Sequence, residues 1–125
     1  MNVQIYKLKS VGKLARREQI VDASFREAIE RAERGIIDAD LGAGLIKQRV
    51  ARHGQGRSGG YRMMIAFRSE HRAIFLLGFA KSERDNISPD QLAALHLVAG
   101  GWLNASDAQM AAALYEGFLQ EVSDD

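Results

Sequence analysis

The sequence predicts an α+β fold, in which a small, mostly antiparallel sheet packs with N-terminal helices and precedes two C-terminal helices. Three segments with strand-like alternation follow one another between residues 45 and 81, and segments with helical periodicity lie on both sides of them. Such a run of strands between blocks of helices is typical of α+β proteins. A chain of 125 residues fits one domain. We expect a single domain over residues 1–125, with a core over about 1–87 and a helical extension over about 88–122.

The N-terminal part is expected to form one strand and one or two helices. Residues 3–6 fit a short edge strand, and residues 11–17, after Ser10, fit a short basic helix or turn. Asp22 is a good N-cap for a helix that runs to about Arg34. Apolar residues recur at helical spacing in this segment, and Gly35 marks its end.

Three strands are expected next. Residues 45–51 alternate, with Lys47 and Arg49 on one face and Ile46, Gln48 and Val50 on the other. Residues 61–67 also alternate, and after a turn at 68–71 the chain returns over residues 72–81. This last segment is apolar on both faces, so it should be a central strand.

Two helices are predicted at the C-terminal end by their capping residues. Residues 88–91 and 106–109 both fit a capping box, and Pro89 takes the first helical position of the first helix. Each helix carries an apolar stripe. The stripes are Leu92, Leu95, Ala99 and Leu103 in the first helix and Met110, Leu114 and Phe118 in the second.

Composition excludes several classes of site. There is no cysteine, and the three histidines have no metal-ligand spacing, so we expect no metal and no cofactor. No apolar run approaches the roughly 20 residues that span a bilayer, and the N-terminus lacks the apolar part of a signal peptide. We therefore expect a cytoplasmic protein with no membrane partner.

The net charge of +1 conceals two regions of opposite charge. Residues 45–84 contain nine Lys or Arg but only two acids, whereas residues 104–125 contain five acids and no Lys or Arg. One hypothesis is that this acidic tail screens the basic region. The nine basic residues are Lys47, Arg49, Arg52, Arg57, Arg62, Arg68, Arg72, Lys81 and Arg84.

The segment Gly54–Gly59 matches the dinucleotide-binding pattern G-x-G-x-x-G. That pattern binds a pyrophosphate only where a strand leads into a helix, and here Gly60 leads into a strand instead. We interpret the segment as a glycine-rich hairpin loop, flanked by Arg52 and Arg57, that is suited to lie against phosphates. His53 in this loop could act as a general base, but it has no evident partner in the sequence, so a solvated loop histidine is the better interpretation. His71, in a tight turn, and His96, on a helix, have no predicted function.

Five of the basic residues come from three successive predicted strands and can converge on one surface of the sheet. Cleavage of RNA by its 2′-hydroxyl develops negative charge on a pentavalent phosphate, which guanidinium and ammonium groups stabilise. From composition alone, a solvated set of strand ends is an equally good interpretation. The five are Lys47, Arg49, Arg62, Lys81 and Arg84.

Residues 38–52, 54–62 and 78–87 resemble a HigB-like branch of the RelE/ParE toxin superfamily. The similarity is closest from about residue 20 to 87, and the blocks S-G-G-Y-R and F-A-K-S-E-R-D-N-I, in this order, carry it. The resemblance implies a toxin of a type II toxin–antitoxin system and a small antiparallel sheet whose basic face holds messenger RNA on the ribosome. It also implies a metal-independent endoribonuclease and a helix-turn-helix antitoxin as partner, and it leaves the oligomeric state open.

The resemblance also assigns roles to individual residues. Arg62 matches the arginine of the G-Y-R block, and Lys81 and Arg84 match the basic residues of the last block, so these three are the candidate catalytic residues. Lys47 and Arg49 resemble the basic pair of the first strand, and the candidate RNA-binding residues are Lys47, Arg49, Arg52 and Arg57.

The sequence departs from RelE at two positions. Ser82 stands where RelE has a further arginine, and Ser88 stands where RelE has its catalytic tyrosine. A serine hydroxyl is too weak an acid to replace tyrosine, so the proton-transfer groups stay unassigned. Inhibition of DNA gyrase, as in ParE-like relatives, and non-catalytic binding of RNA or antitoxin remain alternatives, because fold does not determine function.

Overall fold

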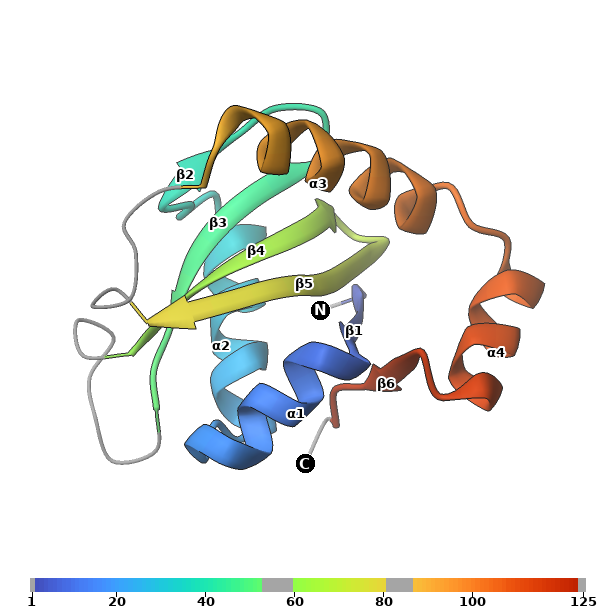
Figure 1. The fold of residues 1–125 in the computed structure, drawn as a ribbon, viewed down its shortest axis with the longest axis horizontal. Coiled ribbons are helices and arrows are strands. Elements are labelled where there is room, and N and C mark those ends of the chain that lie inside the picture. The colour runs from blue at the N-terminus through green and yellow to red at the C-terminus, as the bar shows by residue number, and fades with distance from the viewer. Residues whose placement is uncertain (1, 53–59, 81–86, 124–125) are drawn as a thin grey trace.

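The computed structural model describes residues 2–52, 60–80 and 87–123, and within them six strands form one sheet (Figure 1). The strand order is β2-β3-β4-β5-β1-β6. The elements are β1 (Gln4–Leu8), α1 (Lys9–Glu18), α2 (Asp22–Glu33), β2 (Ala39–Asp40), β3 (Leu45–Val50), β4 (Tyr61–Arg68), β5 (Arg72–Ala80), α3 (Pro89–Leu103), α4 (Asp107–Glu116) and β6 (Leu119–Glu121).

The sheet is mixed but mostly antiparallel, as predicted. Only the pairing of β1 with β5 is parallel among the described strands, with Ile5 opposite Ala73. The prediction that the N-terminal strand lies at an edge is wrong, because β6 pairs with the outer side of β1 and places Gln120 opposite Lys7. The prediction that β5 is central is confirmed, since it lies between β4 and β1.

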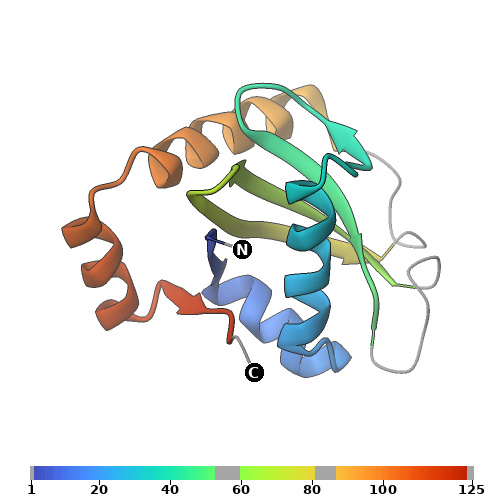
Figure 2. The ribbon, with the colours of Figure 1, turned by 180° about the vertical axis from the view of Figure 1, so that it is seen from behind.

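Helices α1 and α2 cover one face of the sheet, and α2 lies across the strands (Figure 2). Phe25 of α2 meets Phe75 of β5 edge to face, with ring centroids 4.7 Å apart, and both rings are fully buried. At Gly78 of β5 a Cβ atom would lie 2.4 Å from Met63 Sδ and 2.8 Å from a methyl carbon of Leu14. A larger residue at position 78 would therefore push α1 away from the sheet.

Helix α3 covers part of the other face. Its predicted stripe is confirmed, since Ala99 and Leu103 are buried against apolar residues of β3, β4 and β5. Arg68 donates to the carbonyl of Leu103, and Arg72 donates to those of Trp102 and Ala105. These cations meet the negative end of the helix dipole and satisfy carbonyls that have no partner within the helix.

Both predicted capping boxes are present, at Ser88 and at Ser106. The predicted apolar stripe of the second helix is wrong at Phe118, which is 61% exposed. Helix α4 ends at Glu116, before Phe118, and Gly117 turns the chain with a φ of 82°. The chain then returns as β6, a strand that the sequence analysis did not predict.

Asp22 joins three distant parts of the chain. It is the first residue of α2 rather than its N-cap, which is Val21. Its carboxylate accepts hydrogen bonds from Lys7 Nζ of β1 at 2.7 Å and from the backbone N–H of Ser123 at 2.8 Å. Burial alone would raise the pKa of Asp22, but these hydrogen bonds outweigh it and lower the pKa below its ordinary value.

A second polar junction fixes β3 against α2. The side-chain amide of Gln48 is fully buried, donates to the carbonyls of Ala28 and Ile36, and accepts from the N–H of Asp38 at 2.7 Å. Arg31 of α2 is also buried, and it donates to Glu27 at 2.7 Å and to the backbone carbonyl of the residue after Gln48. Most polar groups of this corner thus have hydrogen-bond partners, as burial requires. The exception is Arg31 Nη1, which makes no hydrogen bond and lies 3.7 Å from Asp38 Oδ2.

We predict that Asp22→Asn lowers stability at neutral pH and that the loss disappears in acid. A carboxylate with a lowered folded-state pKa stabilises the fold above its unfolded-state pKa of about 3.9, and this contribution vanishes as pH falls through the folded-state value. The expected loss at pH 7 is about 1.5–3 kcal/mol, the range for hydrogen bonds to charged groups. Urea denaturation at pH 7, 5 and 3 measures it, with Glu30→Gln on the exposed side of α2 as control. A loss that is equally large at pH 3 would contradict the prediction.

We predict that Gln48→Ala destabilises the protein by about 2–4 kcal/mol, because it removes a buried side chain and leaves Asp38 N–H and Ile36 C=O without their partner. Gln4→Ala in β1 is the matched control, since Gln4 is an exposed glutamine of a strand. It should change stability by less than about 0.5 kcal/mol. Equal effects of the two substitutions in thermal denaturation would show that the amide network contributes nothing.

Candidate nucleic-acid interface

The register of β3 and β4 brings together three of the predicted basic residues. Arg49 lies directly opposite Arg62, and Lys47, two residues before Arg49, lies opposite Met64. Alternation along each strand places all three on the face that α3 covers in part, as the sequence predicted for Lys47 and Arg49. The result is a cationic cluster, Lys47, Arg49 and Arg62, at the open end of that face.

The backbone hydrogen bonds of Arg49 set the spacing of this cluster. Its N–H donates to Asp38 Oδ2 at 2.7 Å, and its carbonyl accepts from Arg31, so both groups point away from β4. Arg49 and Arg62 therefore form a non-hydrogen-bonded pair, in which opposite Cβ atoms lie about 4.5–5.5 Å apart. Asp38 and Arg31 could not be recognised from the sequence as positioning residues, because nothing in their local pattern shows which strand they reach.

Like charges at this spacing repel each other and cost free energy. Among the residues that the structure describes, the side chains of Lys47 and Arg49 have no hydrogen-bonding or ion-pair partner. An anion between the two strands would relieve the repulsion, and guanidinium groups bind the oxygens of phosphates in a bidentate manner. The arrangement can therefore hold a phosphate and neutralise charge that develops on it.

The cluster lies where the apolar cover of the sheet ends. Along one face of β3, Leu45 is fully buried, Lys47 is partly buried and Arg49 is exposed. Phe79 of β5, opposite Arg62, is buried in the core, and so is Tyr61. Neither ring is available for stacking on a base in this structure.

Arg52 does not join the cationic cluster. Its guanidinium lies 3.6 Å from Glu18 of α1, the helix on the opposite face of the sheet. The same carboxylate accepts a hydrogen bond from the Tyr61 hydroxyl, and this bond is the main reason why the pKa of Glu18 is lowered. Burial, and then the bond to Glu18, raises the pKa of Tyr61. Arg52 thus anchors the end of β3 to α1.

Three predicted site residues, Arg57, Lys81 and Arg84, lie outside the described residues, and so does His53. His96 Nε2 lies 3.0 Å from the carbonyl of Leu41, where it links α3 to the loop before β3, and His71 is exposed in the β4–β5 turn. Within the described ranges, no three His, Asp or Glu side chains gather to hold a metal ion. None of the helices described is long and apolar enough to cross a membrane.

The acidic C-terminal segment lies at the other edge of the sheet. Asp107 is 3.6 Å from Arg72, and Glu121 belongs to β6, four strands away from β3 in the sheet order. In the described part of the chain, these acids therefore do not screen the cationic cluster. Two of the five tail acids, Asp124 and Asp125, lie outside the described residues.

Comparison with known proteins agrees with the resemblance seen in the sequence. A family model described as the RelE toxin of the RelE / RelB toxin-antitoxin system matches residues 3–122. No curated protein is a significant match. The family match runs through β6 and so covers the C-terminal helices as well as the strands. Its extent shows that this chain belongs to the RelE toxin family of toxin–antitoxin systems.

Proposed function

We propose that this toxin is a ribosome-dependent endoribonuclease that cuts messenger RNA and so stops translation in the cytoplasm. The observation that carries the proposal is the pair of arginines, Arg49 and Arg62, that face each other across β3 and β4 with Lys47 beside them. Three cations on one face of two neighbouring strands attract an anion, and guanidinium groups bind phosphate oxygens in a bidentate manner. Messenger RNA supplies a phosphate at every nucleotide, and membership of a family of toxins supports a target inside the cell.

The proposed reaction is attack by the 2′-hydroxyl of one nucleotide on the adjacent phosphate. The P–O bond to the next 5′-oxygen breaks, and a 2′,3′-cyclic phosphate and a 5′-hydroxyl result. The pentavalent transition state carries an additional negative charge, which cations held in fixed positions stabilise. We assign this role to Arg62, together with Lys81 and Arg84 from the segment after β5, and propose that Lys47 and Arg49 bind neighbouring phosphates.

Arg52 and Arg57 flank the glycine-rich segment between β3 and β4, and we propose that they contact RNA backbone entering the site. The contact of Arg52 with Glu18 would have to be exchanged for one with a phosphate. The family implies an antitoxin partner of RelB type. We propose that the antitoxin of this chain is a helix-turn-helix protein and that it neutralises the toxin while bound.

We predict that cells producing this protein show new messenger RNA 5′ ends within translated regions and that Arg62→Ala removes them. Loss of one group that stabilises developing charge lowers a rate by about 10²–10³-fold. Primer extension measures the ends, and circular dichroism of the purified variant verifies that it folds. Arg16→Ala, on the exposed side of α1, is the matched control and should cut like the unaltered protein.

Other outcomes of the same experiment would contradict the proposal. Growth arrest with intact messages and broken DNA would indicate gyrase inhibition. Arrest without damage to either nucleic acid would indicate a module that only binds. If the folded Arg62→Ala variant still cuts messenger RNA, Arg62 does not belong to the catalytic site, and the basic cluster is a solvated set of strand ends.

We predict that Lys47 and Arg49 each contribute one phosphate contact. The logarithm of the affinity for single-stranded RNA falls linearly with the logarithm of salt concentration, with a slope of about −0.7 per contacted phosphate. Lys47→Ala and Arg49→Ala should each reduce the steepness of this slope by about 0.7. Fluorescence anisotropy with a labelled RNA of non-cleavable 2′-O-methyl nucleotides measures the slope, and an unchanged slope in both variants would contradict the assignment.

A further inference from the structure

The carboxylate of Glu18, the last residue of α1, meets groups from three parts of the chain. Its Oε2 accepts a hydrogen bond from Arg17 Nε at 3.3 Å, and its Oε1 accepts one from the hydroxyl of Tyr61, the first residue of β4. Arg52 Nη1, from the residue two positions after β3, lies 3.6 Å from the same Oε1. One carboxylate thus connects α1 to the adjoining ends of β3 and β4.

Arg52 is the partner that Glu18 can lose most easily. A distance of 3.6 Å is too long for a hydrogen bond, whereas Arg17 and Tyr61 both hydrogen-bond to the carboxylate. The side chains of Arg52 and Glu18 are 37% and 27% exposed, and ion pairs so accessible to solvent are weak. The bond from Tyr61 is the largest cause of the lowered pKa of Glu18, and the charge of Arg52 contributes least. Glu18 would therefore keep two partners if Arg52 left.

Arg52 lies at the same end of the sheet as the cationic cluster. Val50, the last residue of β3, is opposite Tyr61, and the preceding pair is Arg49 and Arg62. Because Arg52 follows the last residue of the strand, pairing within the sheet does not fix its side chain to one face. Carboxylate and phosphate offer a guanidinium group the same kind of charged oxygen acceptor. The Glu18 carboxylate and a phosphate at this end of the sheet are therefore rival partners of one guanidinium group.

We propose that Glu18 competes with RNA for Arg52 and so limits the affinity of the toxin for RNA. This proposal rests on the proposed function for RNA as the ligand. Glu18 acts through Arg52 and is a positioning residue. An RNA strand already held by the cationic cluster presents its next phosphate at a high effective concentration and displaces Glu18, whereas a single free phosphate does not. Arg52 then strengthens binding only to RNA that occupies the cluster.

We predict that Glu18→Gln raises the affinity for single-stranded RNA about twofold to fivefold, which corresponds to the strength of an exposed ion pair. The variant keeps an oxygen that accepts the hydrogen bond from Tyr61 but removes the charge that holds Arg52. Fluorescence anisotropy with the labelled 2′-O-methyl RNA measures the affinity at low ionic strength, where screening is weakest. Glu30→Gln removes the same charge from an exposed position of α2 and should change the affinity by less than about 1.5-fold.

A double-mutant cycle tests whether Glu18 acts through Arg52. In an Arg52→Ala background, Glu18→Gln should change the affinity by less than about 1.5-fold, because no guanidinium group is left to release. A merely structural role of Glu18 would give the same effect with and without Arg52.

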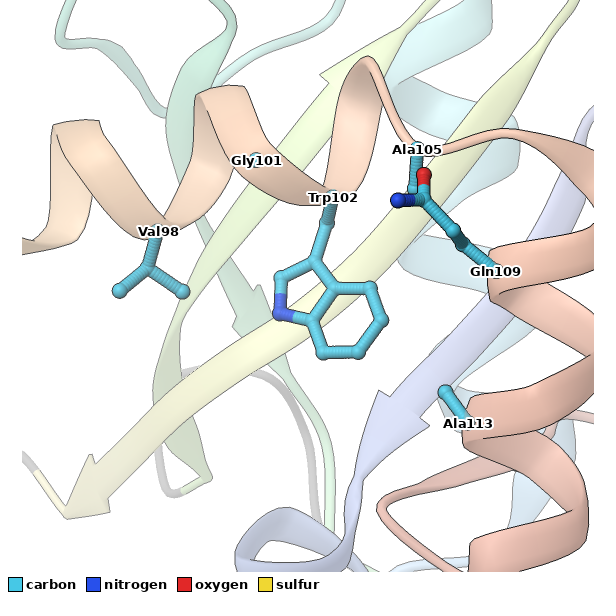
Figure 3. A pocket seen from close by; sticks show the side chains of 6 residues that line it. All are labelled: Val98, Gly101, Trp102, Ala105, Gln109 and Ala113. Carbon is cyan, nitrogen blue, oxygen red and sulfur yellow. The ribbon is translucent and has the colours of Figure 1, made fainter.

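Trp102 verifies that each variant folds, since it is the only tryptophan and lies far from the substitutions. Its indole lines a pocket between α3 and α4 (Figure 3), and it packs against the core on the face of the sheet opposite to α1. An unchanged emission spectrum therefore shows that the second layer of helices is intact.

The proposal is overturned if folded Glu18→Gln binds RNA no more tightly than the unaltered protein, if Glu30→Gln gains as much, or if the gain persists without Arg52. Anisotropy with non-cleavable RNA does not depend on cleavage, and primer extension reports cleavage alone. Normal cutting of messages without coupling between Glu18 and Arg52 would contradict only this proposal. Coupling without any cutting would contradict only the nuclease function.

Discussion

The fold is organised around β5, because helices must cover both faces of this strand. After Arg72 this strand is apolar, and it lies inside the sheet, so water must be excluded from each side of it. Helices α1 and α2 pack on one side, but α3 packs on the other only toward the β4–β5 turn. The cations Lys47, Arg49 and Arg62 occupy the part of this face that α3 does not reach. The exposed Arg49 and the partly buried Lys47 and Arg62 thus lie where this second layer of helices is incomplete.

The two ends of the chain depend on each other through β1. Parallel pairing with β5 leaves the outer side of β1 without partners, and only the antiparallel strand β6 satisfies it. Asp22 reinforces this arrangement by bonding at once to Lys7 of β1 and to Ser123 after β6. The C-terminal helices are therefore connected back into the sheet, and α4 stays near the sheet because β6 holds its far end.

Structural features that depend on residues close together in the sequence were predictable. Features that depend on contacts between residues far apart in the sequence were not. The alternation of β3 and β4 and the capping boxes at Ser88 and Ser106 are local patterns, and the structure confirms them. The short strand β6 has no pattern of its own, because its three residues become a strand only beside β1. For the same reason the interior position of β1 was missed.

At the candidate site, too, local patterns were predictable from the sequence and long-range contacts were not. Strand alternation placed Lys47 and Arg49 on one face, but the partner that holds Arg52 against α1 is Glu18, more than thirty residues away in sequence. Arg31 and Asp38 orient the backbone of Arg49 across the α2–β3 corner, a role that requires the tertiary structure to be seen. Charge along a chain predicts which residues attract phosphate, but only packing decides which of them share a surface.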